Sequence, residues 1–237
     1  MSFDLFARRP SAAAIILGAA AFSLLVGLGV WQLWRLAEKR QLIATIETRI
    51  TAPAVDLPAS GVEPAAWRYR RVRLRGVFQH EREFHLFSTN RAGKPGYQVI
   101  TPLVRPDGLV VLVDRGWVPA DRKDPATRPQ GQLAGEVTVV GLVHAPWRRG
   151  WFVPANDPAR NLWFYGDLAA MAAQLDAARI APVFVDADAT PNPGGLPVGG
   201  QTKIVIRNDH LQYAITWFAL ALALAVMFVL YHRRPSA

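Results

Sequence analysis

Three residues near the C-terminus have the types and the spacing of a candidate cofactor site. His210, Tyr213 and Trp217 occupy positions i, i+3 and i+7, and a helix would bring them to one side. They stand at the start of a long apolar segment, where a histidine beside aromatic rings could serve as an axial ligand or as a proton-titrating group. The alternative is that these amphipathic rings only mark the level of the lipid headgroups. The residue types alone favour this second interpretation, since a single motif carries little information.

A second group of potential metal ligands lies at 80–85, in the sequence HEREFH. Its two histidines and two glutamates are residue types that bind zinc, but their spacing matches no standard ligand template. Because the group falls between two strand-like segments, we expect a solvated turn rather than a metal site.

Two further stretches place polar or aromatic side chains at the ends of apolar segments. Asp114 and Arg115 end a hydrophobic run just before Trp117. We expect an ion pair that closes the strand end over the tryptophan, with a role in substrate binding as the alternative.

The stretch NLWFYGDL at 161–168 is rich in aromatics, which are expected in the core although they could also line a pocket. Nothing around His144 or His232 sets them apart from structural or interfacial residues.

The sequence lacks the motifs that commonly indicate catalysis. It contains no GxSxG, HExxH, Walker-type loop or GxGxxG, and the only serines of the central region, Ser60 and Ser88, have no activating context. The absence of cysteine excludes disulfides, thiolate metal sites and covalent c-type haem attachment. We therefore expect a protein that is not an enzyme.

Two apolar segments predict a membrane protein. Residues 12–30 contain no charge and are long enough to span a bilayer, and residues 208–230 are almost wholly apolar after the first turns. Short tails, residues 1–11 and 231–237, flank these two transmembrane helices. A cleaved signal peptide would have a shorter apolar core and a small-residue cleavage site, so residues 12–30 are expected to be an uncleaved anchor.

Residues 31–66 are expected to form an amphipathic stalk and a linker. Apolar residues continue at helical spacing to about Arg49, and prolines at 53 and 58 end the helix. Three residues fit the membrane interface, where aromatic rings and long basic side chains gather; they are Trp31, Trp34 and Arg35. Arg35 and Glu38 are close enough in sequence to pair on a helix.

Residues 67–207 have the pattern of a β domain. From Trp67 the hydrophobic period changes to 2, with a break at Gly76 after which Val77 and Phe78 join the apolar face. Further alternating segments separated by turn signals predict about seven short strands, the last of them at 203–206, and a short helix begins at Asp167. We expect a mainly antiparallel β domain, a barrel or a sandwich, with one short helix.

Charge indicates where the domain lies and what it meets. Residues 31–207 contain 23 Lys and Arg against 16 Asp and Glu, but no nucleic-acid recognition motif. Lipid headgroups, carboxylate-bearing ligands or acidic proteins are better partners. The short tails carry Arg8-Arg9 and Arg233-Arg234, which favours cytoplasmic termini and an extracytoplasmic domain.

Five stretches resemble the Surfeit-1 family of cytochrome c oxidase assembly proteins. They are GVWQLWRLAEK at 29–39, GYQVITPLV at 96–104, VLVDRGWVP at 111–119, NLWFYGDL at 161–168 and NDHLQYAITWF at 208–218. The resemblance extends from Gly29 to Arg234 and includes the order of these stretches and the layout with two anchors. HEREFH does not contribute to it.

The resemblance implies a biogenesis factor for a haem–copper terminal oxidase. Bacterial members of the family are implicated in binding haem A for its insertion into subunit I of the oxidase. Matched by position, the histidine of NDHLQYAITWF is His210, which the resemblance makes the candidate axial ligand of the haem iron. It also implies the bacterial cell inner membrane, with two spans, cytoplasmic termini and the main domain in the periplasm.

A transiently bound haem A would draw on residues near one membrane surface. Its propionates could meet Arg35, Lys203 and Arg207, while Trp31, Tyr213 and Trp217 could offer flat apolar contact. The implied partners are oxidase subunit I, haem A synthase and membrane lipids. Two alternatives stay open: a scaffold that stabilises a subunit I intermediate without binding haem, and a membrane-tethered enzyme, which the missing motifs disfavour.

Overall fold

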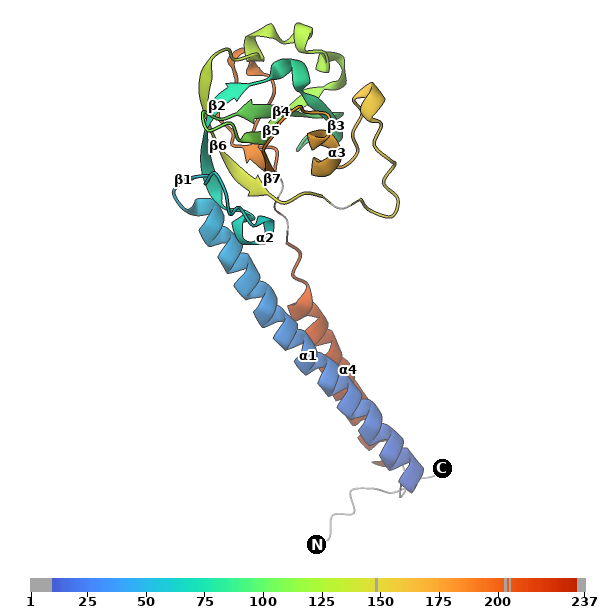
Figure 1. Ribbon diagram of the computed structural model, residues 1–237. Helices are drawn as coiled ribbons and strands as arrows, with labels where there is room; N and C mark the ends of the chain where they lie inside the picture. The colour runs from blue at the N-terminus through green and yellow to red at the C-terminus, as the bar shows by residue number, and fades with distance from the viewer. Residues whose placement is uncertain (1–9, 148, 203, 205, 234–237) are drawn as a thin grey trace. The chain divides into compact units, whose positions relative to one another are not determined.

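The computed structural model describes residues 10–147, 149–202, 204 and 206–233. The chain divides into two units, one formed by Met1–Thr45 with Val205–Ala237 and the other by Ile46–Ile204. The first unit is helical and the second is a β domain, as the ribbon shows (Figure 1). The two units are described separately below.

The helical unit contains most of α1 (Ala12–Thr51) and all of α4 (His210–Arg233). Each helix is long and apolar enough to cross a membrane, and only 6% and 11% of their most apolar windows are buried within the protein. The predicted pair of transmembrane helices is thereby confirmed. α1 runs without a break to Thr51, just before Pro53, and its division into a span and a stalk stays a prediction.

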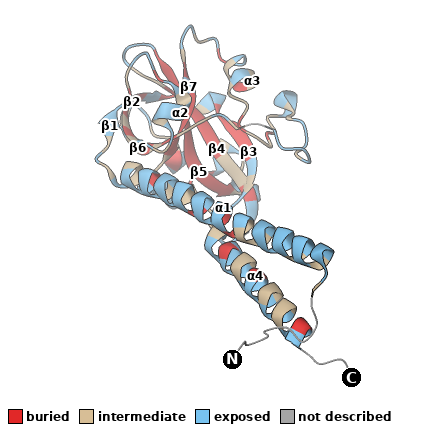
Figure 2. Ribbon diagram, turned by 90° about the horizontal axis from the view of Figure 1, so that it is seen from below, coloured by how far each residue is buried: buried red, intermediate tan, exposed pale blue. Residues whose placement is uncertain are grey.

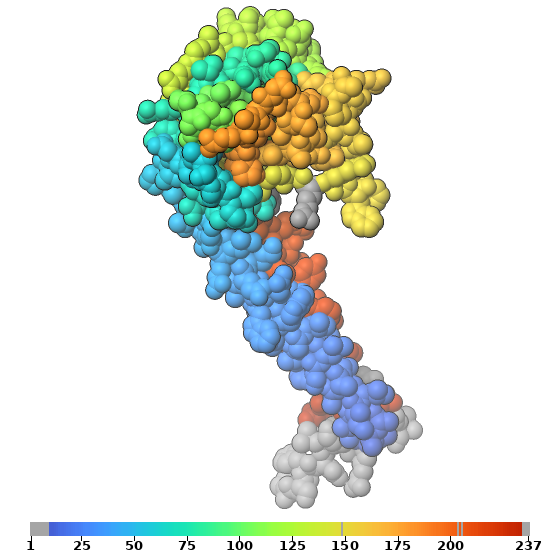
Figure 3. All heavy atoms as spheres, in the orientation of Figure 1, coloured from blue at the N-terminus to red at the C-terminus, as the bar shows by residue number. Residues whose placement is uncertain are grey.

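Small residues on α1 let the rings of α4 approach its backbone. A Cβ atom at Gly29 would lie 2.7 Å from the ring of Phe218, and one at Gly18 would lie 3.3 Å from the ring of Phe228. The two contacts run in opposite order along the chain, so the helices are antiparallel. Close packing at glycine is a common way for membrane helices to associate, since lipid provides no hydrophobic force between them. The space-filling view shows the two helices against each other (Figure 3).

Within the described residues, the β domain contains seven strands and two short α-helices. The strands are β1 (Val55–Asp56), β2 (Arg71–Phe78), β3 (Phe84–Thr89), β4 (Pro95–Val104), β5 (Val110–Pro119), β6 (Glu136–His144) and β7 (Ile180–Ala187). The helices are α2 (Pro64–Trp67) and α3 (Leu168–Ala172). The side chain of Asp167 caps α3 by accepting from the amide of Ala170, so this helix begins where the sequence predicts it.

Five of the strands close into a barrel. β2 pairs with β6, β6 with β7, β7 with β5, β5 with β4, and β4 again with β2. β1 and β3 extend the sheet beside β2 and β4. Among the strand pairs of the described residues, β1–β2 and β5–β7 are parallel and the others are antiparallel, so the prediction of a mainly antiparallel β domain is confirmed in its barrel form.

β5 is buried on both faces and separates two hydrophobic clusters. Val111 and Val113 belong to a cluster with residues from all five barrel strands, whereas Val110 and Leu112 belong to another with α3 and Trp163. Alternating side chains of one strand therefore enter different clusters, which explains why its sequence is continuously apolar. Figure 2 shows buried residues concentrated on the strands of the domain. The predicted core position of the 161–168 aromatics is confirmed for Trp163, which is fully buried.

Gly76 lies where the barrel closes. The prediction of a break here is wrong: β2 continues through Gly76, which points inward with Phe78, and Val77 is exposed. β2 pairs with β6 up to Val77 and with β4 at Val77 and Phe78, so both neighbouring strands crowd this point. A Cβ atom at Gly76 would lie 2.4 Å from the carbonyl oxygen of Val104, and a backbone atom cannot move aside as a flexible side chain can.

Two other boundaries differ from the sequence prediction. Trp67 ends α2, and β2 begins only at Arg71, after Tyr69 adopts a left-handed backbone with φ of 64°. A strand was also predicted at 203–206, but Ile204 and Ile206 have no regular secondary structure. Residues 203 and 205 lie outside the described residues.

We expect Gly76→Ala to destabilise the β domain by about 1–3 kcal/mol, because the added methyl group must displace the backbone of β4 at the point of closure. Val77→Ala is the matched control, since its side chain is exposed on the same strand. Thermal unfolding of the purified full-length protein measures both. Equal melting temperatures for Gly76→Ala and the wild type would contradict this account of barrel closure.

Candidate functional site

His210 is the first residue of α4 and lies on the face of that helix that meets α1. Ala214 and Ala221, at positions i+4 and i+11, are 1% and 3% exposed along the same face. His210 itself is partly buried. The histidine therefore stands at the end of the seam between the two membrane helices.

Gln32 of α1 binds His210 across this seam. The distance from Nδ1 of the imidazole to Oε1 of the amide is 2.6 Å, and Gln32 is only 8% exposed. Nε2, the other ring nitrogen of His210, forms no hydrogen bond with any of the described residues. One ring nitrogen is therefore held by the protein and the other is available to a ligand.

The three aromatic residues predicted to contact the cofactor differ in how far they are exposed. Trp31 is 48% exposed and Tyr213 is 54% exposed, so both offer ring surface to a molecule from outside. Trp217 is partly buried, and its indole Nε1 is a buried donor without a hydrogen-bond partner in the described part of the chain. An unsatisfied buried N–H is costly, and because this atom is closed to solvent it offers no accessible donor to a molecule from outside.

The predicted anion-binding arginines are each paired with a local acid. Arg35 binds Glu38 at 2.5 Å, which confirms the predicted pair, and Arg207 binds Asp209 at 2.9 Å. The arginine side chains are 45% and 84% exposed, so these pairs contribute little to stability and can exchange partners. Lys203, the third predicted cation, lies outside the described residues.

A single histidine suits a metal cofactor that brings most of its own ligands. No group of three or more His, Cys, Asp or Glu side chains within the described ranges could hold a metal ion. Haem supplies four equatorial nitrogens and needs only axial ligands from the protein. The features that such a macrocycle would require here are the unbonded Nε2 of His210 and the exposed rings of Trp31 and Tyr213.

The 80–85 cluster of the β domain forms an internal ion pair instead of a solvated turn. Glu83 and Arg128 are in direct contact, with side chains 3% and 2% exposed. Glu83 also accepts a 2.8 Å hydrogen bond from Nε2 of His85. The prediction of solvation is wrong for Glu83 and His85, because Arg128 supplies the opposite charge that a buried carboxylate requires from 45 residues away.

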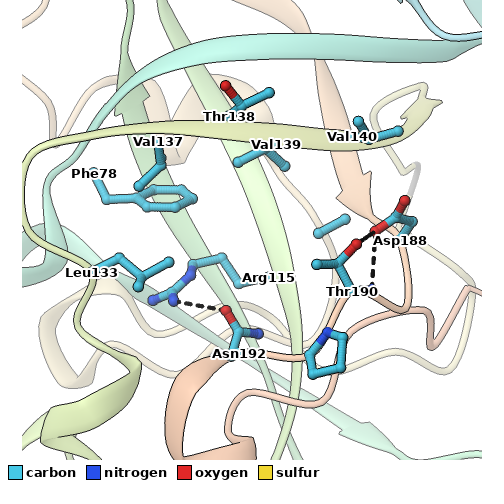
Figure 4. A pocket seen from close by; sticks show the side chains of 12 residues that line it. Phe78, Arg115, Leu133, Val137, Thr138, Val139, Val140, Asp188, Thr190 and Asn192 are labelled. Atoms are coloured by element: carbon cyan, nitrogen blue, oxygen red, sulfur yellow. Dashed lines mark hydrogen bonds between the residues drawn. The ribbon is translucent and has the colours of Figure 1, made fainter.

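Arg115 is a second buried cation, and it lines a small cavity of about 140 Å³ (Figure 4). It donates to the carbonyl oxygen of Gly131 and to Oδ1 of Asn192, and its guanidinium lies 4.7 Å from the centre of the Phe78 ring. Burial lowers the pKa of Arg115 to about 10. Burial also lowers the pKa of His80, whose Nδ1 lies 3.3 Å from Arg115. The contacts are those of a structural cation that fastens loops to the barrel.

Asp114 faces Asp186 rather than Arg115. The two aspartates occupy paired positions of the parallel strands β5 and β7, so their side chains lie on one face. They are 8% and 6% exposed and line a polar cavity of about 300 Å³. Burial and then the neighbouring carboxylate raise the pKa of Asp114 well above its ordinary value, and burial raises the pKa of Asp186. The predicted Asp114–Arg115 ion pair is wrong, because successive strand residues point to opposite faces.

Sequence reasoning missed Gln32 and Asp186. Gln32 is separated from His210 by 178 residues, and Asp186 meets Asp114 only through the pairing of β5 with β7. Gln32 is nevertheless a lone amide between Trp31 and Leu33, and a polar residue in such a setting is a signal that it has a polar partner.

Comparison with known proteins covers both the seam and the barrel. The SURF1 family model matches residues 19–222. The chain is 40% identical to Surfeit locus protein 1 of Rattus norvegicus over 217 residues, which is 85% of this chain and 70% of the rat protein. It is 39% identical to the Homo sapiens protein of the same name over 218 residues, which is 85% of this chain and 72% of the human protein. It is also 39% identical to a SURF1-like protein of Monosiga brevicollis over 222 residues, which is 88% of this chain and 83% of the Monosiga protein.

The buried aspartate pair predicts a pH dependence of folding. A raised carboxyl pKa means that the folded protein binds the proton more tightly than the unfolded chain does. The contribution of the pair to stability is therefore complete below the pKa of an unfolded aspartate, and it is lost as the pH rises through the raised pKa. Asp114→Asn should relieve this loss and still accept from the Gly116 amide, so the variant should be more stable than the wild type at neutral pH.

Melting temperatures of the full-length protein between about pH 4 and about pH 8 test this expectation. The Asp114→Asn profile should be flatter than that of the wild type. Asp176→Asn is the control, because the Asp176 side chain is 96% exposed. Parallel profiles for Asp114→Asn and the wild type would show that the pair does not titrate as described.

Proposed function

Because this chain belongs to the SURF1 family of cytochrome oxidase assembly factors, we propose that it binds haem A and assists its insertion into subunit I of a haem–copper oxidase. In this function the protein is not a catalyst but a carrier that holds the cofactor before the oxidase receives it. Haem A synthase and oxidase subunit I are then the proteins with which it must exchange the cofactor.

The observation that carries the proposal is the state of His210. Its imidazole is partly buried at the start of a membrane helix, with Nδ1 bonded to Gln32 and Nε2 without a partner among the described residues. A neutral imidazole nitrogen is a common axial ligand of haem iron. Haem A has a long apolar tail and two carboxylates, and it therefore belongs at the boundary between lipid and headgroups.

The neighbouring residues fit the other parts of the cofactor. Trp31 and Tyr213 expose rings that can lie against a flat macrocycle. Arg35 and Arg207 can bind the propionates by leaving Glu38 and Asp209. Both ion pairs are exposed, so this exchange costs little free energy.

A single protein ligand also suits transfer. His210 would hold the cofactor as a single protein ligand, and the exposed rings of Trp31 and Tyr213 would leave it accessible to a receiving protein. A permanent haem site would instead be enclosed by the protein. The alternative function, a scaffold for subunit I that binds no haem, would require none of these features of the seam.

We further propose the bacterial cell inner membrane as the location, with both termini in the cytoplasm and the β domain in the periplasm. Because the chain has no cysteine, single cysteines report topology without background. A membrane-impermeant maleimide should label Ala92→Cys, in an exposed turn, in intact spheroplasts. A cysteine appended after Ala237 should be labelled only after permeabilisation. The reverse pattern would invert the proposed orientation.

The direct test of haem binding is His210→Ala. We expect the variant, purified from cells that make haem A, to lose haem by about tenfold or more, because the iron loses its protein ligand. Alanine favours the helix and lowers the polar content of the span, so membrane insertion should be unchanged. Arg35 and Arg207 variants should lose less, since each removes a propionate contact rather than the iron bond.

His232→Ala is the matched control, because it makes the same change at the other end of α4. Haem content per polypeptide, read from the optical spectrum of the protein in detergent, compares the variants. Equal haem in wild type and His210→Ala would reject the ligand assignment and leave the scaffold function in its place.

A further inference from the structure

We propose that Gln32 is the positioning residue for His210, fixing which ring nitrogen of the imidazole faces the cofactor. The role rests on the proposed function, because it assigns to Gln32 the orientation of a ligand for haem iron. It concerns a residue of α1, 178 positions before the histidine.

The chemistry of the contact determines the position of the proton. An amide oxygen can only accept a hydrogen bond, so Nδ1 of His210 must donate across the 2.6 Å to Oε1 of Gln32. A neutral imidazole has one N–H, and Nε2 therefore keeps its lone pair. Gln32 thus selects the tautomer in which Nε2 is the nitrogen that can bind iron.

The burial of Gln32 supports a specific pairing. The residue is 8% exposed, and its neighbours Trp31 and Leu33 are exposed, so α1 turns this one polar side chain inward. An amide removed from water is costly unless it is hydrogen-bonded, and His210 is the side-chain partner that the structure shows for it. The cost of burying the Gln32 amide without a partner therefore favours the conformation in which Gln32 and His210 are hydrogen-bonded.

The packing of the helices sets the distance between the two side chains. Gly29 lies three residues before Gln32, on the same side of α1, and the Phe218 ring fills the space where its Cβ would be. On α4, Ala214 separates His210 and Phe218 by one turn each along the buried face. The close approach of the two helices at Gly29 thus brings the amide of Gln32 within hydrogen-bonding distance of the His210 imidazole.

A purely structural role for the bond gives different expectations from a positioning role. A bond that only joined the helices would change the stability of the apoprotein when removed, and nothing else. A bond that orients a ligand also changes the tautomer of His210 and the spectrum of bound haem. Loss of such an outer partner typically costs about 10–100-fold in metal affinity.

The first experiment needs no haem. Ring-¹⁵N-histidine is incorporated into the full-length protein in nanodiscs, and the five histidines are distinguished by the signals that His210→Ala removes. In the wild type we expect the His210 signals of a protonated Nδ1 and an unprotonated Nε2. In Gln32→Leu we expect this preference to be lost, whereas Gln32→Glu should keep it because a carboxylate oxygen still accepts.

The second experiment titrates the same proteins with haem A. Gln32→Leu should bind about 10–100-fold more weakly than the wild type, with an altered Soret band. Gln32→Glu should restore affinity and lower the reduction potential, since a stronger acceptor makes the imidazole a better donor to iron. Gln212→Leu is the matched control: it makes the same change on an exposed residue two positions from His210 and should match the wild type.

Three results would overturn the assignment. The first is a protonated Nε2 on His210 in the wild-type apoprotein. The second is an unchanged tautomer and haem affinity in Gln32→Leu, and the third is a lower melting temperature in that variant with no change in tautomer or spectrum. Failure of the proposed function is recognised separately, because wild type and His210→Ala would then bind haem equally whatever the tautomer measurement shows.

Discussion

The close contact of α1 with α4 is the constraint on which the candidate site depends. In lipid there is no hydrophobic force between two apolar helices, so the fit of their side chains sets the distance between them. Gly29 allows the Phe218 ring to approach the α1 backbone. At this separation Gln32 forms a hydrogen bond with His210. The hydrogen bond between Gln32 and His210 therefore depends on the apolar contact between Gly29 and Phe218.

The β domain buries several charged side chains around its barrel. Glu83 is neutralised by Arg128, and Arg115 is held by carbonyl and amide oxygens. Asp114 and Asp186 form no salt bridge with Lys or Arg among the described residues, and burial raises the pKa of both carboxyl groups. These polar groups attach the long loops to a barrel whose two hydrophobic clusters are divided by β5.

The sequence predicts the parts of this protein that local patterns determine. Apolar length reveals both membrane helices, alternation reveals most strands, and the capping aspartate locates α3. Pairing between distant segments is not encoded locally, which is why the Arg128 partner of Glu83 and the Asp186 partner of Asp114 were missed. His210 was identified as a candidate, but its bond to Gln32 depends on the packing of two helices from opposite ends of the chain.

The distance along the chain between the two halves of the seam has a consequence for biosynthesis. A ribosome makes Gln32 early, whereas His210 emerges 178 residues later, after the last strand that the barrel needs. A nascent polypeptide that ends before His210 therefore has at most half of the site. Under the proposed function, only a finished chain with a completed periplasmic domain can accept haem, which protects unfinished translation products from capturing a reactive cofactor.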